Sequence, residues 1–176
     1  FRKAADEVDN IFWKQTFGDK NAIMALPDGP AKDLAIINYG PWDRMDDNQP
    51  FIDGYGAKPA GACFYPADMT KEEFDALEDP AKMSPYTLIK RGEDGKLKVV
   101  WYHDEYKESV DKIAGYLEAA ATMTIKESVR NYLLKRAEAL RTDSYKESDY
   151  AWMDMKDSKM DLVIGPIENY EDGING

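Results

Sequence analysis

Few side chains in this sequence can act as nucleophiles or metal ligands. The 176 residues include one histidine, His103, and one cysteine, Cys63. Zinc, copper and haem sites draw on several His or Cys side chains, and a Ser-His-Asp triad depends on a positioned His. His103 is followed by Asp104 and Glu105, but neighbours in sequence point apart in a strand or a helix, so a loop or cap role is favoured over a metal site. Chemistry must therefore use carboxylates, or groups outside this chain.

Acidic residues between positions 43 and 53 suggest a calcium loop, which needs alternating oxygen ligands and a central glycine. Met45 stands where a ligand is required and the glycine comes too late, so a solvated acidic turn is favoured for Asp43, Asp46, Asp47 and Asp53. Residues 54–56 resemble a phosphate loop only in composition, because Pro59 interrupts the run and no helix is signalled directly after it.

Aromatic residues are concentrated in a stretch rich in proline and glycine: Tyr39, Trp42, Phe51, Tyr55, Phe64 and Tyr65. Rigid aromatic rings next to carboxylates suit a cationic, partly apolar ligand such as a peptide N-terminus. The alternative is that the rings simply pack together in a long ordered loop. Both interpretations remain open from the sequence.

Charge and hydropathy argue against nucleic-acid binding and against a membrane span. There are 23 Lys and Arg against 34 Asp and Glu, which gives a formal net charge of −11. Nucleic acid is not an expected partner, because its binding depends on clustered basic residues. No stretch approaches the ~18 apolar residues of a membrane span. The sequence predicts a soluble protein, and a single cysteine leaves both the cytoplasm and the periplasm open.

The length is compatible with one domain that buries a substantial core. The first residue is Phe1, and the last six residues, 171–176, read as turns with no element to close them. We therefore expect residues 1–176 to be a single fragment domain from the N-terminal or central part of a longer chain.

Hydrophobic periodicity, turn signals and a Thr-x-x-Glu capping box predict the elements that position these residues. Proline and glycine exclude long elements between residues 21 and 66. In the first half of the chain, the predicted elements are a helix over 2–17 stopped by Gly18, a strand over 33–39 and a short helix after Thr70. A hairpin then joins 86–90 to 97–102, and two amphipathic helices, which could be continuous, follow within 105–141. The last predicted elements are a helical turn from 148 and a strand over 160–167 interrupted by Gly165-Pro166. The predicted fold class is α+β, with an irregular β unit and a hairpin packed against several helices.

The segment from Asp157 to Asp172 resembles a segment of the dipeptidyl peptidase III family of zinc metallopeptidases, which reads Val-Glu-Ser-Tyr-Ile-Gly-Phe-Ile-Glu-Ser-Tyr-Arg-Asp. The shared residues are Ile164, Gly165, Ile167, Glu168, Tyr170 and Asp172. The order of elements from Phe64 onward is similar to the family's, and Asn38–Arg44 and Phe51–Gly56 look like its bacterial branch.

This resemblance implies that the chain is the non-zinc part of a two-lobed peptidase that removes dipeptides from the N-terminal end of peptides. The family's zinc motif, His-Glu-x-x-Gly-His or its shorter bacterial variant, is absent. The implied zinc ion is therefore bound outside this chain, by the remainder of the same polypeptide, and we expect the fragment alone to be inactive and to hold no catalytic or metal-binding residue.

The resemblance also implies the substrate-binding residues. Asp161 aligns with the family's Glu that contacts the substrate's free N-terminus, and it keeps the charge on a shorter arm. Val163 aligns with a Tyr that stabilises charge on the attacked carbonyl, and valine has no donor. Glu168, Asn169 and Tyr170 fall at matching or similar positions and would line the same cleft, unless they only make turn hydrogen bonds around Gly165-Pro166.

Two other functions remain compatible with the sequence. One is a stand-alone module that binds peptides or sugars through the aromatic, acidic loop. The other is a structural or interaction domain without a small ligand, whose acidic surface serves solubility.

Overall fold

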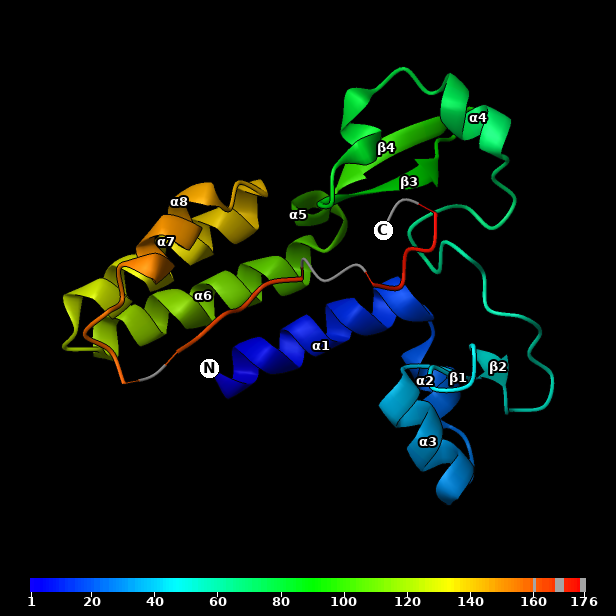
Figure 1. Cartoon of the computed structure of the whole chain (residues 1–176), viewed down its shortest axis with the longest axis horizontal. Coiled ribbons are helices and arrows are strands. Elements are labelled where there is room, and N and C mark those ends of the chain that lie inside the picture. The colour runs from blue at the N-terminus through cyan, green and yellow to red at the C-terminus, as the bar shows by residue number, and fades with distance from the viewer. Residues whose placement is uncertain (160, 167–169, 175–176) are drawn as a thin grey trace. The chain divides into compact units, whose positions relative to one another are not determined.

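The computed structural model describes residues 1–159, 161–166 and 170–174. It divides into two compact units. Unit 1 takes Phe1–Ile11 and Val100–Glu168, and unit 2 takes Phe12–Val99 and Asn169–Gly176. Helices alternate with two small two-stranded sheets (Figure 1), so the predicted α+β class is confirmed. In the described part of the chain, no helix is both long enough and apolar enough to cross a membrane.

Unit 1 is helical. It holds the first part of α1 (Arg2–Thr16), then α5 (Tyr102–Glu105), α6 (Lys107–Met123), α7 (Glu127–Thr142) and α8 (Lys146–Met153). Helices α6 and α7 pack side by side, and α8 lies against α7 (Figure 1). The apolar stripes of the two predicted amphipathic helices supply most of the buried core, although Val129 is only half-buried. The buried members are Val110, Ile113, Ala114, Leu117 and Ala121 on α6, and Tyr132, Leu133, Arg136, Ala137 and Leu140 on α7.

Helices α6 and α7 are separate, and local hydrogen bonds explain the break between them. Thr124 is extended, and its hydroxyl accepts the backbone N–H of Lys126 at 3.2 Å. A threonine side chain that bonds nearby backbone in this way competes with helix continuation. The Arg130 side chain then donates to the carbonyls of Ala121 and Thr124, at 3.2 and 2.8 Å, which gives partners to the end of α6.

Unit 2 contains the rest of α1 and a series of short elements. They are α2 (Lys20–Met24), α3 (Pro30–Asn38), β1 (Trp42–Asp43), β2 (Gln49–Pro50), α4 (Lys71–Ala76), a 3₁₀ turn η1 (Pro80–Met83), β3 (Thr87–Arg91) and β4 (Leu97–Trp101), of which the last two residues fall in unit 1. β1 pairs antiparallel with β2, with Trp42 opposite Pro50. Trp13, Ile23 and Ala35 form a buried cluster, and Phe17, Leu26, Tyr39 and Phe51 pack against it.

The predicted strand over 33–39 is wrong, because these residues belong to α3. Pro30 follows Gly29 and starts the helix at its first position, where the missing N–H costs nothing. Tyr39 ends it in the left-handed conformation, with the Gly40 N–H bonded to the Ala35 carbonyl at 2.9 Å. The apolar run that suggested a buried strand is mostly surface: Ala35 is fully buried, whereas Ile37 is 70% exposed.

Local signals elsewhere are confirmed. α1 ends before Gly18, which has a φ of +88° and bonds to the Trp13 carbonyl. The Thr70 and Glu73 side chains make both bonds of the capping box of α4. The hairpin forms as predicted, with Gly95 at a φ of +76° and the Gly92 N–H bonded to the Lys96 carbonyl at 2.8 Å.

Residues 161–166 do not form the predicted strand, because they have no strand partner. The other ends of that prediction, Met160 and Ile167, lie outside the described residues. An apolar run with a Gly-Pro interruption lacks the N–H at proline that a ladder requires, which disfavours pairing there.

Candidate functional site

The segment Asp161–Pro166 lies on unit 1 and presents alternate residues to the core and to solvent. Ile164 is 7% exposed, whereas Val163 on its N-terminal side is 65% exposed. Val163 therefore offers only an apolar surface to solvent, at the position that the resemblance aligns with a tyrosine. Two of the predicted site residues, Glu168 and Asn169, lie outside the described residues.

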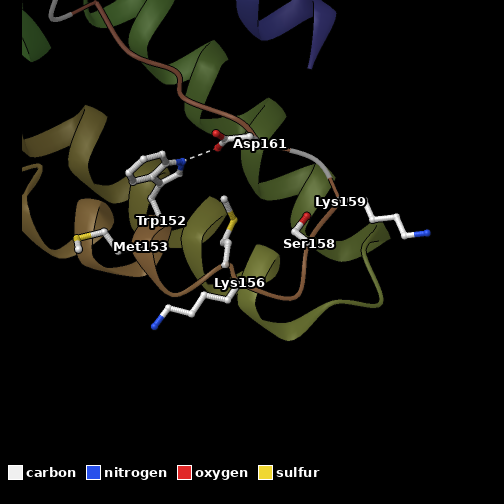
Figure 2. A pocket seen from close by; sticks show the side chains of 7 residues that line it. Trp152, Met153, Lys156, Ser158, Lys159 and Asp161 are labelled. Atoms are coloured by element: carbon white, nitrogen blue, oxygen red, sulfur yellow. Dashed lines mark hydrogen bonds between the residues drawn. The ribbon is translucent and has the colours of Figure 1, made fainter.

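Asp161 is exposed and faces a concavity of about 450 Å³ (Figure 2). One carboxylate oxygen, Oδ1, accepts the indole N–H of Trp152 at 2.7 Å. Figure 2 shows the amines of Lys156 and Lys159 pointing away from this carboxylate. The lining combines one carboxylate with an indole, two thioethers and lysine stems, from Trp152, Met153, Met155, Lys156, Ser158, Lys159 and Asp161.

The loop from 154 to 159 carries this lining from the end of α8 to Asp161. Successive turn bonds shape it, including Met155 N–H to the Trp152 carbonyl at 3.1 Å. Asp157 ties the loop to the start of α7, because it accepts the Ser128 hydroxyl at 2.5 Å and pairs with Lys126 at 3.3 Å. The hydrogen bond from Ser128, followed by that from Lys126, holds the pKa of Asp157 below its ordinary value.

This arrangement suits a cation with an apolar body. A carboxylate offers about four acceptor positions, and Asp161 uses one of them for Trp152. In the described part of the chain, Asp161 has no ion-pair partner within 4.0 Å, so its charge remains available to a ligand. The adjacent indole face and thioethers provide dispersion and cation–π contacts.

Tyr170 lies in the second described part of the resembling segment, which packs on unit 2. Its neighbours hold the segment: Glu171 is paired with Arg44 at 2.7 Å and with Lys58, Asp172 accepts the Tyr65 hydroxyl at 2.7 Å, and the Gly173 N–H bonds to a carbonyl of residue 60 at 2.7 Å. The Tyr170 side chain is 88% exposed at the rim of a second concavity of about 450 Å³.

Sequence reasoning missed the partners that hold both segments. Trp152 is 37% exposed and bonded to Asp161, a contact that the sequence does not indicate. Arg44 and Lys58 were given no role, although both pair with Glu171. Lys58 and Glu171 are 113 positions apart in the sequence, so no local sequence pattern predicts their contact.

The described residues do not fit a metal ion. Among residues 1–159, 161–166 and 170–174, no group of three or more His, Cys, Asp or Glu side chains is placed to hold one. His103 instead bonds through Nδ1 to Oδ2 of the buried Asp143 at 2.7 Å. Burial raises the pKa of Asp143, and the bonds from His103 only partly offset that effect.

Among the acidic and aromatic residues between 39 and 65, Asp43 and Trp42 make structural contacts. Asp43 accepts the Met45 N–H at 2.9 Å, as in an Asx turn. Trp42 is 7% exposed, donates its indole N–H to the Gly56 carbonyl at 2.8 Å, and meets the ring of Phe17 edge-on. These contacts favour ring packing over ligand binding for the aromatic loop.

Comparison with known proteins identifies similar chains. The structure matches that of DPP III from Caldithrix abyssi with a TM-score of 0.89 and 41% identity, over 99% of this chain and 35% of that one. It matches dipeptidyl-peptidase III from Corallococcus sp. strain EGB with a TM-score of 0.79 and 30% identity, over 97% of this chain and 36% of that one. A search against protein-family models found no match.

A similar curated sequence carries a different name. The Arabidopsis thaliana protein called Nudix hydrolase 3 is 29% identical over an alignment of 237 residues, which covers 99% of this chain and 31% of that protein. The chain therefore spans about a third of the length of each of these relatives.

Proposed function

Because the chain resembles dipeptidyl peptidase III over almost its whole length, we propose that it forms part of the substrate cleft of a peptidase that cleaves peptides from the N-terminal end. The ligand is a peptide with a free N-terminus. In this proposal the zinc ion of such a peptidase is held by the remainder of the polypeptide, because the family's zinc motif does not occur in this sequence. The chain alone binds peptide without cleaving it.

The single observation that carries this proposal is the placement of Asp161. Its carboxylate is exposed, has no cationic partner among the described residues, and lies on the wall of a concavity (Figure 2). A peptide ammonium group donates three hydrogens and carries one positive charge, so it pairs with a carboxylate through charge-assisted hydrogen bonds. Among the charged residues that line this concavity, Asp161 is the acid and Lys156 and Lys159 are the bases.

Trp152 positions this carboxylate. Its indole N–H holds Oδ1 at 2.7 Å, which leaves Oδ2 and the remaining positions on Oδ1 for the ligand. The indole ring and the thioethers of Met153 and Met155 line the same concavity, where they would contact the first side chain of the peptide. Glu168, Asn169 and Tyr170 are proposed as further substrate-binding residues, as the resemblance implies.

A pair of peptides and a pair of variants test the proposal. The tripeptide Leu-Ala-Phe and its N-acetylated form are titrated into the chain by calorimetry or by NMR. Asp161→Asn keeps an acceptor for Trp152 but removes the charge, so we expect it to weaken binding of the free peptide by about 10-fold and to leave the acetylated peptide almost unchanged.

Asp154→Asn is the matched control, because Asp154 is exposed on the same loop and does not line the concavity. It should bind both peptides like the unmodified chain. Equal weakening of both peptides by Asp161→Asn, or equal effects of the two variants, would contradict the assignment of Asp161 to the ammonium group.

A further inference from the structure

The concavity on unit 2 contains an uneven set of charges. Arg44 and Lys58 both line it, and both pair with one carboxylate, that of Glu171. In the described part of the chain, neither cation has a second acidic partner within 4.0 Å. One positive charge is therefore left without an ion-pair partner, in a protein whose formal net charge is −11.

Neighbouring side chains keep both cations in place. The Arg44 guanidinium lies 5.4 Å from the ring centres of Phe12 and Tyr39, and packing of this kind restrains its plane. The Lys58 side chain is 11% exposed, and its amine donates to Asn48 Oδ1 at 3.3 Å as well as to Glu171. A restrained cation loses less entropy when it binds a ligand than a mobile surface lysine does.

Donor capacity remains for a ligand. A lysine ammonium has three N–H donors, and the two contacts of Lys58 use two of them. Glu171 shows which kind of group the two cations bind. Its carboxylate bridges them, although its side chain is only 7% exposed. The exposed ring of Tyr170 adds an aromatic surface to the rim.

From this juxtaposition we infer that the Arg44–Lys58 concavity binds a carboxylate of the peptide ligand, and the C-terminal carboxylate of a short peptide is the group that it fits. The identity of the ligand as a peptide rests on the proposed function. The recognition itself rests on the two cations, their shared glutamate and the cavity beside them. The ligand carboxylate accepts a hydrogen bond from the third N–H of Lys58, and its negative charge balances the positive charge that Glu171 leaves uncompensated.

Two substitutions should act in opposite directions. Lys58→Met keeps the aliphatic stem and leaves Arg44 and Glu171 as a balanced pair, so we expect it to weaken binding of a free-acid peptide by about 10-fold. Glu171→Gln keeps one acceptor oxygen but removes the negative charge that both cations share, which frees a second positive charge, so it should strengthen binding of the same peptide several-fold. A purely structural role for these residues would not produce a gain.

The test uses Leu-Ala-Phe in four forms: unblocked, N-acetylated, C-amidated and blocked at both ends. The inference predicts that C-amidation weakens binding to the unmodified chain, that Lys58→Met removes this difference, and that raising the ionic strength reduces it. Lys98→Met is the matched control, since Lys98 is exposed on β4 and does not line the concavity. Thermal unfolding of each variant establishes that it is folded.

The four peptides separate this inference from the proposed function. Loss of binding on N-acetylation that depends on Asp161, with no effect of C-amidation, would overturn the inference alone. Loss on C-amidation that depends on Lys58, with no effect of N-acetylation, would overturn the ammonium site alone. Equal affinity for the acid and the amide in the unmodified chain refutes the carboxylate site even if a variant fails to fold.

Discussion

Adjacent side chains in the segment Asp161–Pro166 have opposite environments, and this alternation sets what the segment can do. Ile164 is buried to 7% exposure against unit 1, while Val163 is 65% exposed. Asp161 is exposed as well and bonds to Trp152. An anchor at Ile164 holds the backbone, so the residues on its N-terminal side can present their side chains to a ligand.

Replacing the anchor should cost far more than replacing its neighbour. We expect Ile164→Ala to lower the free energy of unfolding by about 2 kcal/mol or more, because it removes buried methyl groups and leaves a cavity. Val163→Ala should change it by less than about 0.5 kcal/mol, as is usual at an exposed position. Urea unfolding followed by tryptophan fluorescence measures both values, and similar losses for the two variants would contradict the described burial.

At the scale of elements, two glycines show how helix and loop differ in their tolerance of a side chain. Gly115 lies within α6, and a Cβ placed there would meet nothing within 4 Å. Gly173 lies beside the loop at Ala60, and a Cβ there would come within 2.7 Å of the Ala60 carbonyl oxygen. The first glycine only weakens its helix, whereas the second is required by a close backbone approach.

The same substitution at these two glycines should therefore have opposite effects. Gly115→Ala should raise the free energy of unfolding by about 0.5–1 kcal/mol, because alanine loses less entropy in a helix interior. Gly173→Ala should lower it, because the Cβ forces the segment away from Ala60 and strains its hydrogen bond. Chemical unfolding of the two variants compares them directly, and stabilisation by both would show that the close approach at Ala60 is wrong.

The cap of α4 gives a second test at this scale. Thr70 accepts the Glu73 N–H at 3.2 Å, and its own N–H donates to the Glu73 carboxylate at 3.1 Å. Thr70→Ala should lower the free energy of unfolding by about 1 kcal/mol, and Thr70→Ser should restore most of it. Failure of serine to restore stability would mean that the methyl group, and not the hydroxyl, is what matters at this position.

For the molecule as a whole, acidic groups make the stability depend on pH with two opposite signs. The hydrogen bond from Arg141 lowers the pKa of Glu118, so this glutamate stabilises the fold above its unfolded pKa of about 4.3 and loses that contribution as the pH falls through its folded pKa. Burial raises the pKa of Asp143, so its contribution is complete below about pH 4 and is lost as the pH rises through its folded pKa.

Variants that cannot titrate should reveal these two signs. Between about pH 3 and pH 7, the stability of the unmodified chain relative to Glu118→Gln should increase with pH, by a small amount because solvent screens an exposed ion pair. Relative to Asp143→Asn it should decrease over the same range. Unfolding free energies at several pH values measure both slopes. Slopes of the same sign would contradict the opposite directions of the pKa shifts of Glu118 and Asp143.

Signals that act over a few residues were enough to predict much of the fold. The stripe on α6, the capping box at Thr70 and the turn at Gly95 each depend on residues within one or two turns of one another. Their physics is local, because caps, turns and helical faces are decided by adjacent backbone. The apolar run in α3 misled the prediction, since Pro30 and Gly29 set a helix that leaves Ile37 in solvent.

By itself, the sequence determined helices α1, α4, α6 and α7 and the hairpin of β3 and β4, the acidic charge, the single imidazole and the resemblance that singled out Asp161. Only the tertiary structure decided which side chains surround Asp161 and Glu171. Trp152 lies beside Asp161, and Arg44 and Lys58 pair with Glu171. Apart from the short step from Trp152 to Asp161, these pairs join residues more than a hundred positions apart. Packing of whole elements brings such residues together, and no local spacing records it.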